Sequence, residues 1–289
     1  MRCLDAVELA KLRNLRFDLR RLVVDGHLGG RHRSRRRGFA QEFAEHRLYV
    51  PGDEPRRLDW KVYARKERYF VREYQEEKSL RAQLLLDASG SMAYADGGRA
   101  PKWELARRLA LALAYLVLAG GDSAGLALFD GDERAAFPPR RGLPQLDAMD
   151  RALAEASPSG ETDPAVVLRR AAVRLPRRSL VLVVSDLLGE ATEFLSLVRA
   201  LRARRHEVFV LQVLDPSERD LPWDGPTLFE PLEGGESLRC EVGLLRASYR
   251  RLFDERQRLY EAGFHSAGAR YGVFYTDGDW TAGLTRLLA

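Results

Sequence analysis

The sequence is poor in cysteine and contains no long apolar run. Cys3 and Cys240 are its only cysteines among 289 residues. Two cysteines exclude a disulfide framework and a paired-cysteine metal site, and they are typical of a reducing compartment. The most apolar stretch, 109–121, is too short to cross a bilayer, and residues 1–14 lack the apolar centre of a signal peptide. These absences predict a cytoplasmic protein with no membrane span.

Several enzyme signatures are also missing. The sequence has no GxxxxGK phosphate-binding loop, and its histidines lack the HxxxH or HExxH spacing of a zinc site. Residues 121–125 spell GxSxG, but a predicted helix precedes Ser123 and a predicted strand follows it. A serine hydrolase needs the reverse order, a strand before the serine and a helix after it. We therefore expect a protein that is not an enzyme.

Basic charge is carried almost wholly by arginine. Lys and Arg number 47 and Asp and Glu 42, a net charge of +5, yet only five of the basic residues are lysine. So strong a bias makes basicity a weak sign of nucleic-acid binding. The glycine-flanked cluster at 31–37 (RHRSRRR) is typical of a solvated loop. Electrostatic binding of phosphates by this cluster is the alternative, and it is not favoured.

Two strongly apolar stretches lead into carboxylates. Leucines at 84–86 precede Asp87, and the run 179–187 (SLVLVVSDL) contains Asp186 near its end. Continuous apolar runs are typical of strands buried on both faces of a sheet. In a doubly wound sheet, ligands collect outside the carboxyl ends of the central strands. Asp87 and Asp186 are therefore predicted to face each other across one crevice.

Hydroxyl groups accompany both carboxylates. Ser89 and Ser91 alternate with Asp87 on the turn after the first strand, and Thr162 lies in a later loop that enters a helix. Short oxygen ligands at alternate positions of a tight turn can converge on one small hard cation, and Mg²⁺ or Mn²⁺ suits such a set. The alternative is a capping turn in which the same side chains accept hydrogen bonds from backbone N–H groups.

Taken in order, these residues resemble the metal-ion-dependent adhesion site of von Willebrand factor type A domains. The matching residues are Asp87, Ser89, Ser91, Thr162 and Asp186. The resemblance implies that they bind a divalent cation and that a carboxylate from a partner protein completes its coordination. Leu187 departs from the pattern, because many such domains have glycine after the last aspartate.

A second resemblance covers roughly residues 38–186. The matching residues are Gly38, Glu42, Phe43, Arg47, Tyr49, Pro51, Gly52, Asp53, Arg56, Asp59, Trp60, Ala64 and Arg65. This signature is similar to that of the bacterial and archaeal "domain of unknown function" family number fifty-eight, whose members carry a type A-like domain after it. We interpret its charged residues as structural pairs that hold the segment on the domain rather than as a binding surface.

Strands and helices alternate from residue 81 onward. This alternation predicts an α/β fold with a doubly wound, mainly parallel sheet flanked by helices, of the von Willebrand factor type A-like and Rossmann-like kind, over residues 81–289. Residues 1–80 are expected to hold an N-terminal helix, the basic loop and a small β extension that contains the signature.

The residues and the resemblances together predict a non-enzymatic, metal-dependent protein-interaction module. The family resemblance implies a partner among the MoxR-type AAA+ ATPases, a client protein that offers an acidic residue, and a role in the assembly or maturation of other proteins. Two alternatives stay open. One is a metal-dependent phosphoester hydrolase with Asp87 as nucleophile or metal anchor, and the other is a nucleic-acid binder that uses the arginines of 31–37.

Overall fold

The computed structural model describes residues 3–14, 41–50, 53, 58–76, 80–130, 133–161 and 164–289. The chain divides into a larger unit, Met1–Gly29 with Leu80–Ala289, and a small unit, Gly30–Ser79. The sequence-based division had placed residues 1–80 together. In the structure the first helix, α1 (Ala6–Asn14), belongs to the larger unit instead, because Leu4 and Leu12 are buried in the same core as α4 (Lys102–Ala119).

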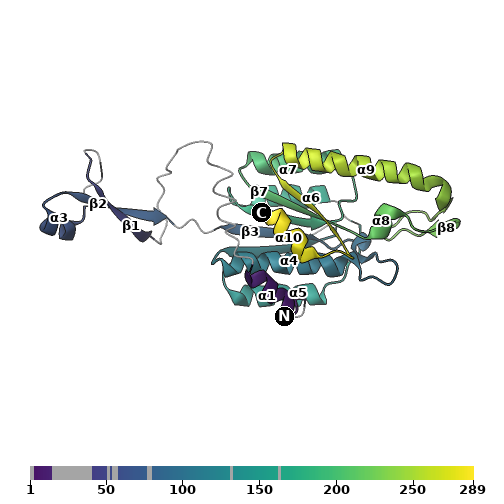
Figure 1. Ribbon diagram of the computed structural model, residues 1–289, viewed down its shortest axis with the longest axis horizontal. Coiled ribbons are helices and arrows are strands. Elements are labelled where there is room, and N and C mark those ends of the chain that lie inside the picture. The colour runs from purple at the N-terminus through teal and green to yellow at the C-terminus, as the bar shows by residue number, and fades with distance from the viewer. Residues whose placement is uncertain are drawn as a thin grey trace. The chain divides into compact units, whose positions relative to one another are not determined.

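The described part of the larger unit is built on a six-stranded sheet of order β10-β7-β6-β3-β4-β5 (Figure 1). Five of these strands are parallel, and the edge strand β5 runs antiparallel to β4. All residues of β6 are buried, which explains its continuous apolar sequence. The strand bounds are β3 (Arg81–Asp87), β4 (Ser123–Phe129), β5 (Glu133–Arg140), β6 (Leu180–Ser185), β7 (Glu207–Leu214) and β10 (Arg270–Tyr275).

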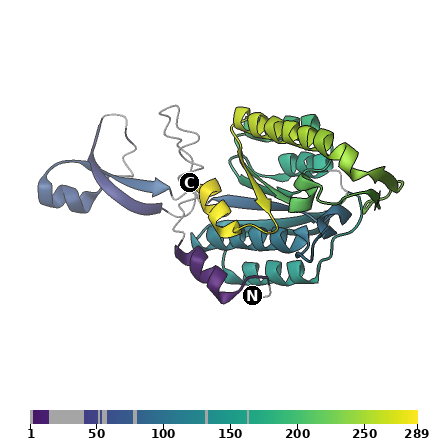
Figure 2. The same cartoon turned by 45° about the vertical axis from the view of Figure 1, so that its right-hand side comes forward.

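Helices cover both faces of this sheet (Figures 1 and 2). On one face α4 packs with α1 and with α5 (Leu143–Glu155) and α10 (Trp280–Leu288), and its buried leucines and alanines fill that core. The other face holds α6 (Pro164–Arg174), α7 (Ala191–Ala203) and α9 (Val242–Ser266). Two separate apolar cores result, one on each side of the sheet.

The chain runs outward from β3 in two directions. It first adds β4 and β5 on one side, and then β6, β7 and β10 on the other. The predicted doubly wound, mainly parallel α/β fold is confirmed, and the strand order reverses beside β3 and β6. A reversal of this kind opens a crevice at the carboxyl ends of the two strands.

The small unit contains an antiparallel pair, β1 (Gln41–Leu48) and β2 (Phe70–Glu76), with the short helix α3 (Trp60–Lys66) between them in sequence. The small β extension was predicted, but α3 was not. Asp59 starts this helix by accepting hydrogen bonds from the backbone N–H groups of Lys61 and Val62.

Between β7 and α9 the chain makes an excursion that the sequence indicates only as turn-rich. It holds the short helix α8 (Pro216–Asp220) and a hairpin of β8 (Pro226–Phe229) and β9 (Leu238–Glu241). In neither the larger unit nor the small one does any described helix combine the length and apolar character needed to cross a membrane.

Candidate metal centre

The turn after β3 gathers three of the predicted ligands. Asp87 is the last residue of the strand, and its Oδ1 accepts a hydrogen bond of 3.0 Å from the Ser89 backbone N–H. A 3₁₀ helix, η2 (Gly90–Ala93), then turns the chain so that the Ser89 and Ser91 hydroxyl oxygens lie 3.0 Å apart. All three side chains are buried. The turn therefore presents a carboxylate and two hydroxyls from one short segment, as predicted.

Asp186 is held beside this turn because β6 pairs in parallel with β3. Ser185, one residue earlier, donates its hydroxyl to Asp87 Oδ2 at 2.6 Å and so links the two strand ends. Burial and, after it, the negative charge of Asp186 together raise the pKa of Asp87 to about 7, against the lowering effect of the serine hydrogen bonds. The two predicted aspartates are thus buried close to each other, and their negative charges repel.

The loop that leads to Thr162 is joined to the same turn by backbone hydrogen bonds. Ser159 N–H donates to the Ala88 carbonyl at 2.9 Å, and Gly90 N–H donates to the Gly160 carbonyl at 2.9 Å. Thr162 itself lies outside the described residues. Its assignment as a ligand stays a prediction, although the described part of its loop is in contact with the turn.

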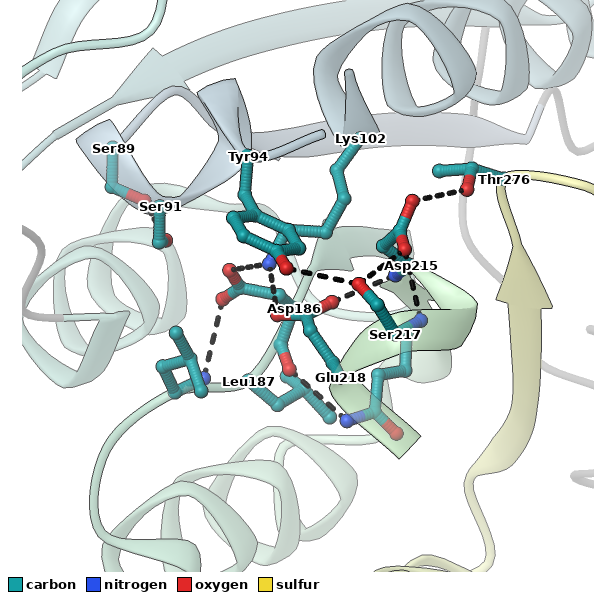
Figure 3. A network of polar contacts seen from close by, with 12 residues as sticks. Ser89, Ser91, Tyr94, Lys102, Asp186, Leu187, Asp215, Ser217, Glu218 and Thr276 are labelled. Carbon is teal, nitrogen blue, oxygen red and sulfur yellow. Dashed lines mark hydrogen bonds and ion pairs between the residues drawn. The ribbon is translucent and has the colours of Figure 1, made fainter. Parts of the chain in front are cut away.

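A lysine that the sequence analysis did not single out completes the site (Figure 3). The fully buried Lys102, at the start of α4, donates from Nζ to Asp186 Oδ2 at 2.8 Å and to Glu218 Oε1 at 2.7 Å. Burial alone would lower the pKa of Lys102, but the two carboxylates outweigh burial and raise it. Its ammonium also lies 5.8 Å from the centre of the Tyr94 ring. Asp186 is therefore an ion-pair partner as well as a candidate ligand.

Asp215, at the carboxyl end of β7, fixes the position of Glu218. Its carboxylate accepts hydrogen bonds from Arg99, Ser217 and Thr276, and its backbone N–H donates to Glu218 Oε2 at 2.7 Å. Burial would raise the pKa of Asp215, but these donors hold it well below its usual range. The Asp-x-x-Glu spacing of a capping box was a sequence signal for this pair.

Leu187 occupies the one position that departed from the expected pattern. Its φ of +59° lies in the left-handed region, which costs a residue other than glycine roughly 1–2 kcal/mol. The Ser185 hydroxyl accepts a hydrogen bond from the Leu187 N–H at 3.0 Å, and the Leu187 carbonyl accepts one from Tyr260 at 2.8 Å. These contacts, and burial of the leucine side chain, hold the turn that glycine would adopt without strain.

The donor set fits a small hard cation. In the described part of the chain, no group of three or more His, Cys, Asp or Glu side chains is suited to a metal ion. A cation at Asp87 would therefore depend on the serine hydroxyls and on water, as Mg²⁺ commonly does. Asp186 and Glu218 share the single positive charge of Lys102, so a divalent ion beside Asp87 would offset the negative charge that remains.

Comparison with known proteins places the chain in a family. Residues 45–261 match the family described as "Protein of unknown function DUF58". The chain belongs to this family. "Uncharacterized protein Rv1480" of Mycobacterium tuberculosis and "Uncharacterized protein Mb1516" of Mycobacterium bovis are each 32% identical to it over 290 residues, which cover 97% of this chain and 88% of each relative.

The solved structures that resemble this chain are much more distant in sequence. The conserved hypothetical protein BatB from Bacteroides thetaiotaomicron has a TM-score of 0.51 and 16% identity, over 73% of this chain and 97% of BatB. The SpRpn10 VWA domain is a weaker match, with a TM-score of 0.42 and 10% identity over 72% of this chain and 94% of that domain. The likeness to BatB shows a shared fold for this DUF58 protein.

The DUF58 signature residues that the structure describes have local roles in the small unit. Asp53 Oδ2 accepts a hydrogen bond from the Val50 N–H, and Asp59 caps α3. The Tyr49 N–H donates to the Tyr69 carbonyl. Trp60 and Arg65 lie on α3 and are exposed, Trp60 by 61%. Pro51, Gly52, Arg56 and the side chain of Arg47 lie outside the description, as does the arginine cluster at 31–37.

The GxSxG sequence is explained by the fold. The helix α4 ends at Ala119, and β4 begins at Ser123, so the chain passes from helix to strand at this serine. The Ser123 N–H donates to the Leu80 carbonyl at 3.0 Å and aligns β4 beside β3. The serine therefore lies at the amino end of its strand, away from the crevice.

Proposed function

We propose that the larger unit is a non-enzymatic, divalent-cation-dependent module that binds an acidic side chain of a partner protein. The observation that carries this proposal is the convergence of Asp87, Ser89 and Ser91 on one buried turn, with Asp186 on the neighbouring strand end. This arrangement lies at the strand-order reversal, where α/β folds commonly bind ligands.

Each residue has a defined part in this proposal. Asp87, Ser89, Ser91 and Thr162 are the proposed ligands of Mg²⁺ or Mn²⁺. Asp186 is the second carboxylate, oriented by Lys102. A bound divalent ion supplies a positive charge that a partner's carboxylate can coordinate. Because Asp87 and Asp186 are themselves negative, that carboxylate would be repelled without the cation, so binding is expected to require it.

Binding is favoured over hydrolysis by the environment of Asp87. A nucleophilic aspartate needs a carboxylate oxygen free to attack the substrate, whereas both oxygens of Asp87 accept hydrogen bonds, one from the Ser89 N–H and one from the Ser185 hydroxyl. The family resemblance further suggests a MoxR-type AAA+ ATPase as partner and a role in assembling or maturing a client protein. In this proposal the module presents the client to the ATPase.

Calorimetric titration with Mn²⁺ tests the cation site. Wild-type protein should bind Mn²⁺ saturably, and both Asp87→Asn and the double variant Ser89→Ala with Ser91→Ala should lose this binding. Asp147→Ala on the exposed surface of α5 is the matched control and should bind as the wild type does. Asp186 is left intact in this test, because its removal would leave Lys102 short of a partner.

Two results would contradict the proposal. One is absence of Mn²⁺ binding by the folded wild type, and the other is unchanged binding by the folded serine variant. If the site is established, co-purification with a MoxR-type ATPase should be lost on addition of a chelator and in Asp87→Asn, but not in Asp147→Ala.

A further inference from the structure

The tip of the β8–β9 hairpin places one more carboxylate on the candidate metal turn. Glu233 Oε1 accepts a hydrogen bond of 2.7 Å from the backbone N–H of Ser91, although 142 residues separate the two in sequence. Ser91 is itself a proposed ligand. Glu233 comes from a segment that was expected only to be turn-rich, and nothing in its local sequence marks it as part of a site.

The tip lies between the two segments that carry the proposed ligands. A Cβ atom added to Gly90 would meet the Leu232 carbonyl oxygen at 2.5 Å and Glu233 Cγ at 3.1 Å, so only glycine at 90 allows this approach. On the other side, a Cβ atom added to Gly234 would meet Glu161 Oε1 at 2.5 Å. Glu161 immediately precedes Thr162. The hairpin tip thus contacts both the turn after β3 and the loop that leads to the remaining ligand.

The hairpin is anchored at its base and exposed along its length. Arg246 of α9 donates to the carbonyl oxygens of Leu221 and Trp223, where the excursion begins. Phe229 packs edge to face against Trp223, but three leucines toward the tip are exposed by 53–61%. They are Leu228, Leu232 and Leu238. Gly234 and Gly235 follow Glu233 with φ values of +71° and +108°, a backbone that glycine adopts readily. The contacts that hold the tip on the turn are therefore separate from those that hold the base of the hairpin.

We propose that Glu233 is the chain's own carboxylate for the cation site and that a partner's acidic side chain binds by displacing it. This inference rests on the proposed function. A neutral acceptor would satisfy the Ser91 N–H equally well, so capping alone does not require a charge at this position. A negative charge beside the proposed ligands favours a divalent cation. The same charge excludes a second carboxylate until the hairpin tip moves away.

Glu233→Gln separates the two roles, because glutamine keeps the oxygen that accepts from Ser91 and removes the charge. We expect this variant to bind Mn²⁺ about tenfold more weakly than the wild type. In the wild type, Mn²⁺ should slow amide hydrogen exchange over 226–241, and this protection should be absent in the variant. Glu236→Gln, on the same hairpin connection and exposed, is the matched control and should keep both wild-type properties.

Acetate serves as a small probe for the partner's carboxylate. In Glu233→Ala, acetate at millimolar concentration should strengthen Mn²⁺ binding, whereas in the wild type it should have no effect because Glu233 holds the position. Wild-type Mn²⁺ affinity and hairpin protection in Glu233→Gln, with no acetate effect in Glu233→Ala, would overturn this inference and leave the proposed function intact. Absence of Mn²⁺ binding by the wild type would overturn both.

Discussion

Lys102 is the residue on which the charge balance of the site depends. Its ammonium group is fully buried between Asp186 and Glu218, and Glu218 is in turn bound by the backbone N–H of Asp215. Burial raises the pKa of Glu218, although the charge of Lys102 opposes this effect. The lysine therefore compensates the buried charge of each carboxylate, and the two carboxylates compensate the charge of the lysine, as expected for ionic groups removed from water.

Lys102→Met is expected to destabilise the protein by about 3–5 kcal/mol, because it leaves two carboxylates without their buried cation. Urea unfolding followed by circular dichroism measures this loss. The control is Arg169→Met, which removes an exposed ion pair with Glu193 and should cost no more than about 1 kcal/mol. Similar unfolding midpoints for the two variants would show that Asp186 and Glu218 do not depend on Lys102.

Sequence reasoning found the aspartates of this site but not the lysine. Asp87 and Asp186 each come at the end of an apolar run. This local pattern can be recognised in the sequence whatever the fold that buries the two strands. Lys102 has no such mark, because it reads as the first polar residue of a helix. Its partners lie 84 and 116 residues further along the chain, and only the folded sheet brings them together.

At the scale of elements, those with long apolar patterns were predicted from the sequence, and a short polar element was not. The strand β3 was predicted from its leucines at 84–86 and the helix α4 from its apolar period, because each buries a continuous or periodic set of leucines. The helix α3 has seven residues, none of them buried, so it carries no such period. It depends instead on the cap at Asp59 and on ring contacts of Tyr63 with Trp60 and Tyr69.

The helix cap at Asp59 predicts that substitutions at Asp59 and at its neighbour Trp60 differ in their effect on the stability of α3. Asp59→Ala should lower the stability of α3 by about 1 kcal/mol, whereas Asp59→Asn, which can still cap, should have little effect. Trp60→Ala should cost less than the loss of the cap, because the indole is 61% exposed. Amide hydrogen exchange over 61–70 reports the local change. Faster exchange in Trp60→Ala than in Asp59→Ala would contradict this ranking and show that the contact of Trp60 with Tyr63 matters more to α3 than the cap.

At the scale of the whole molecule, the two units differ in charge. Residues 30–79 contain fourteen Lys and Arg and nine Asp and Glu, an excess of five that equals the net charge of the entire chain. The remaining residues are therefore balanced overall. We therefore expect sequence-independent attraction to polyanions to come mainly from the small unit, and to weaken with salt whether or not the cation site of the larger unit is intact.

The cation site is expected to link the stability of the protein to Mg²⁺. Above the raised pKa of Asp87, at about pH 8, the buried carboxylate is ionised and its charge opposes folding. This penalty is relieved as the pH falls through the raised pKa, because the folded state then binds a proton that the unfolded state releases. At high pH a bound divalent cation relieves this penalty. A cation present at 100 times its dissociation constant adds about 2.7 kcal/mol to the free energy of unfolding.

At about pH 8, addition of Mg²⁺ should therefore change which protein is more stable, Asp87→Asn or the wild type. Without Mg²⁺ the variant should unfold at the same temperature as the wild type or higher, because it removes a buried charge. With saturating Mg²⁺ the wild type should gain stability and the variant should not. Calorimetric scans with and without Mg²⁺ measure both differences, and Asp147→Ala should follow the wild type. If Mg²⁺ shifts the wild type and Asp87→Asn equally, the stabilising ion binds elsewhere, and Asp87 is then a buried carboxylate held only by its serine donors.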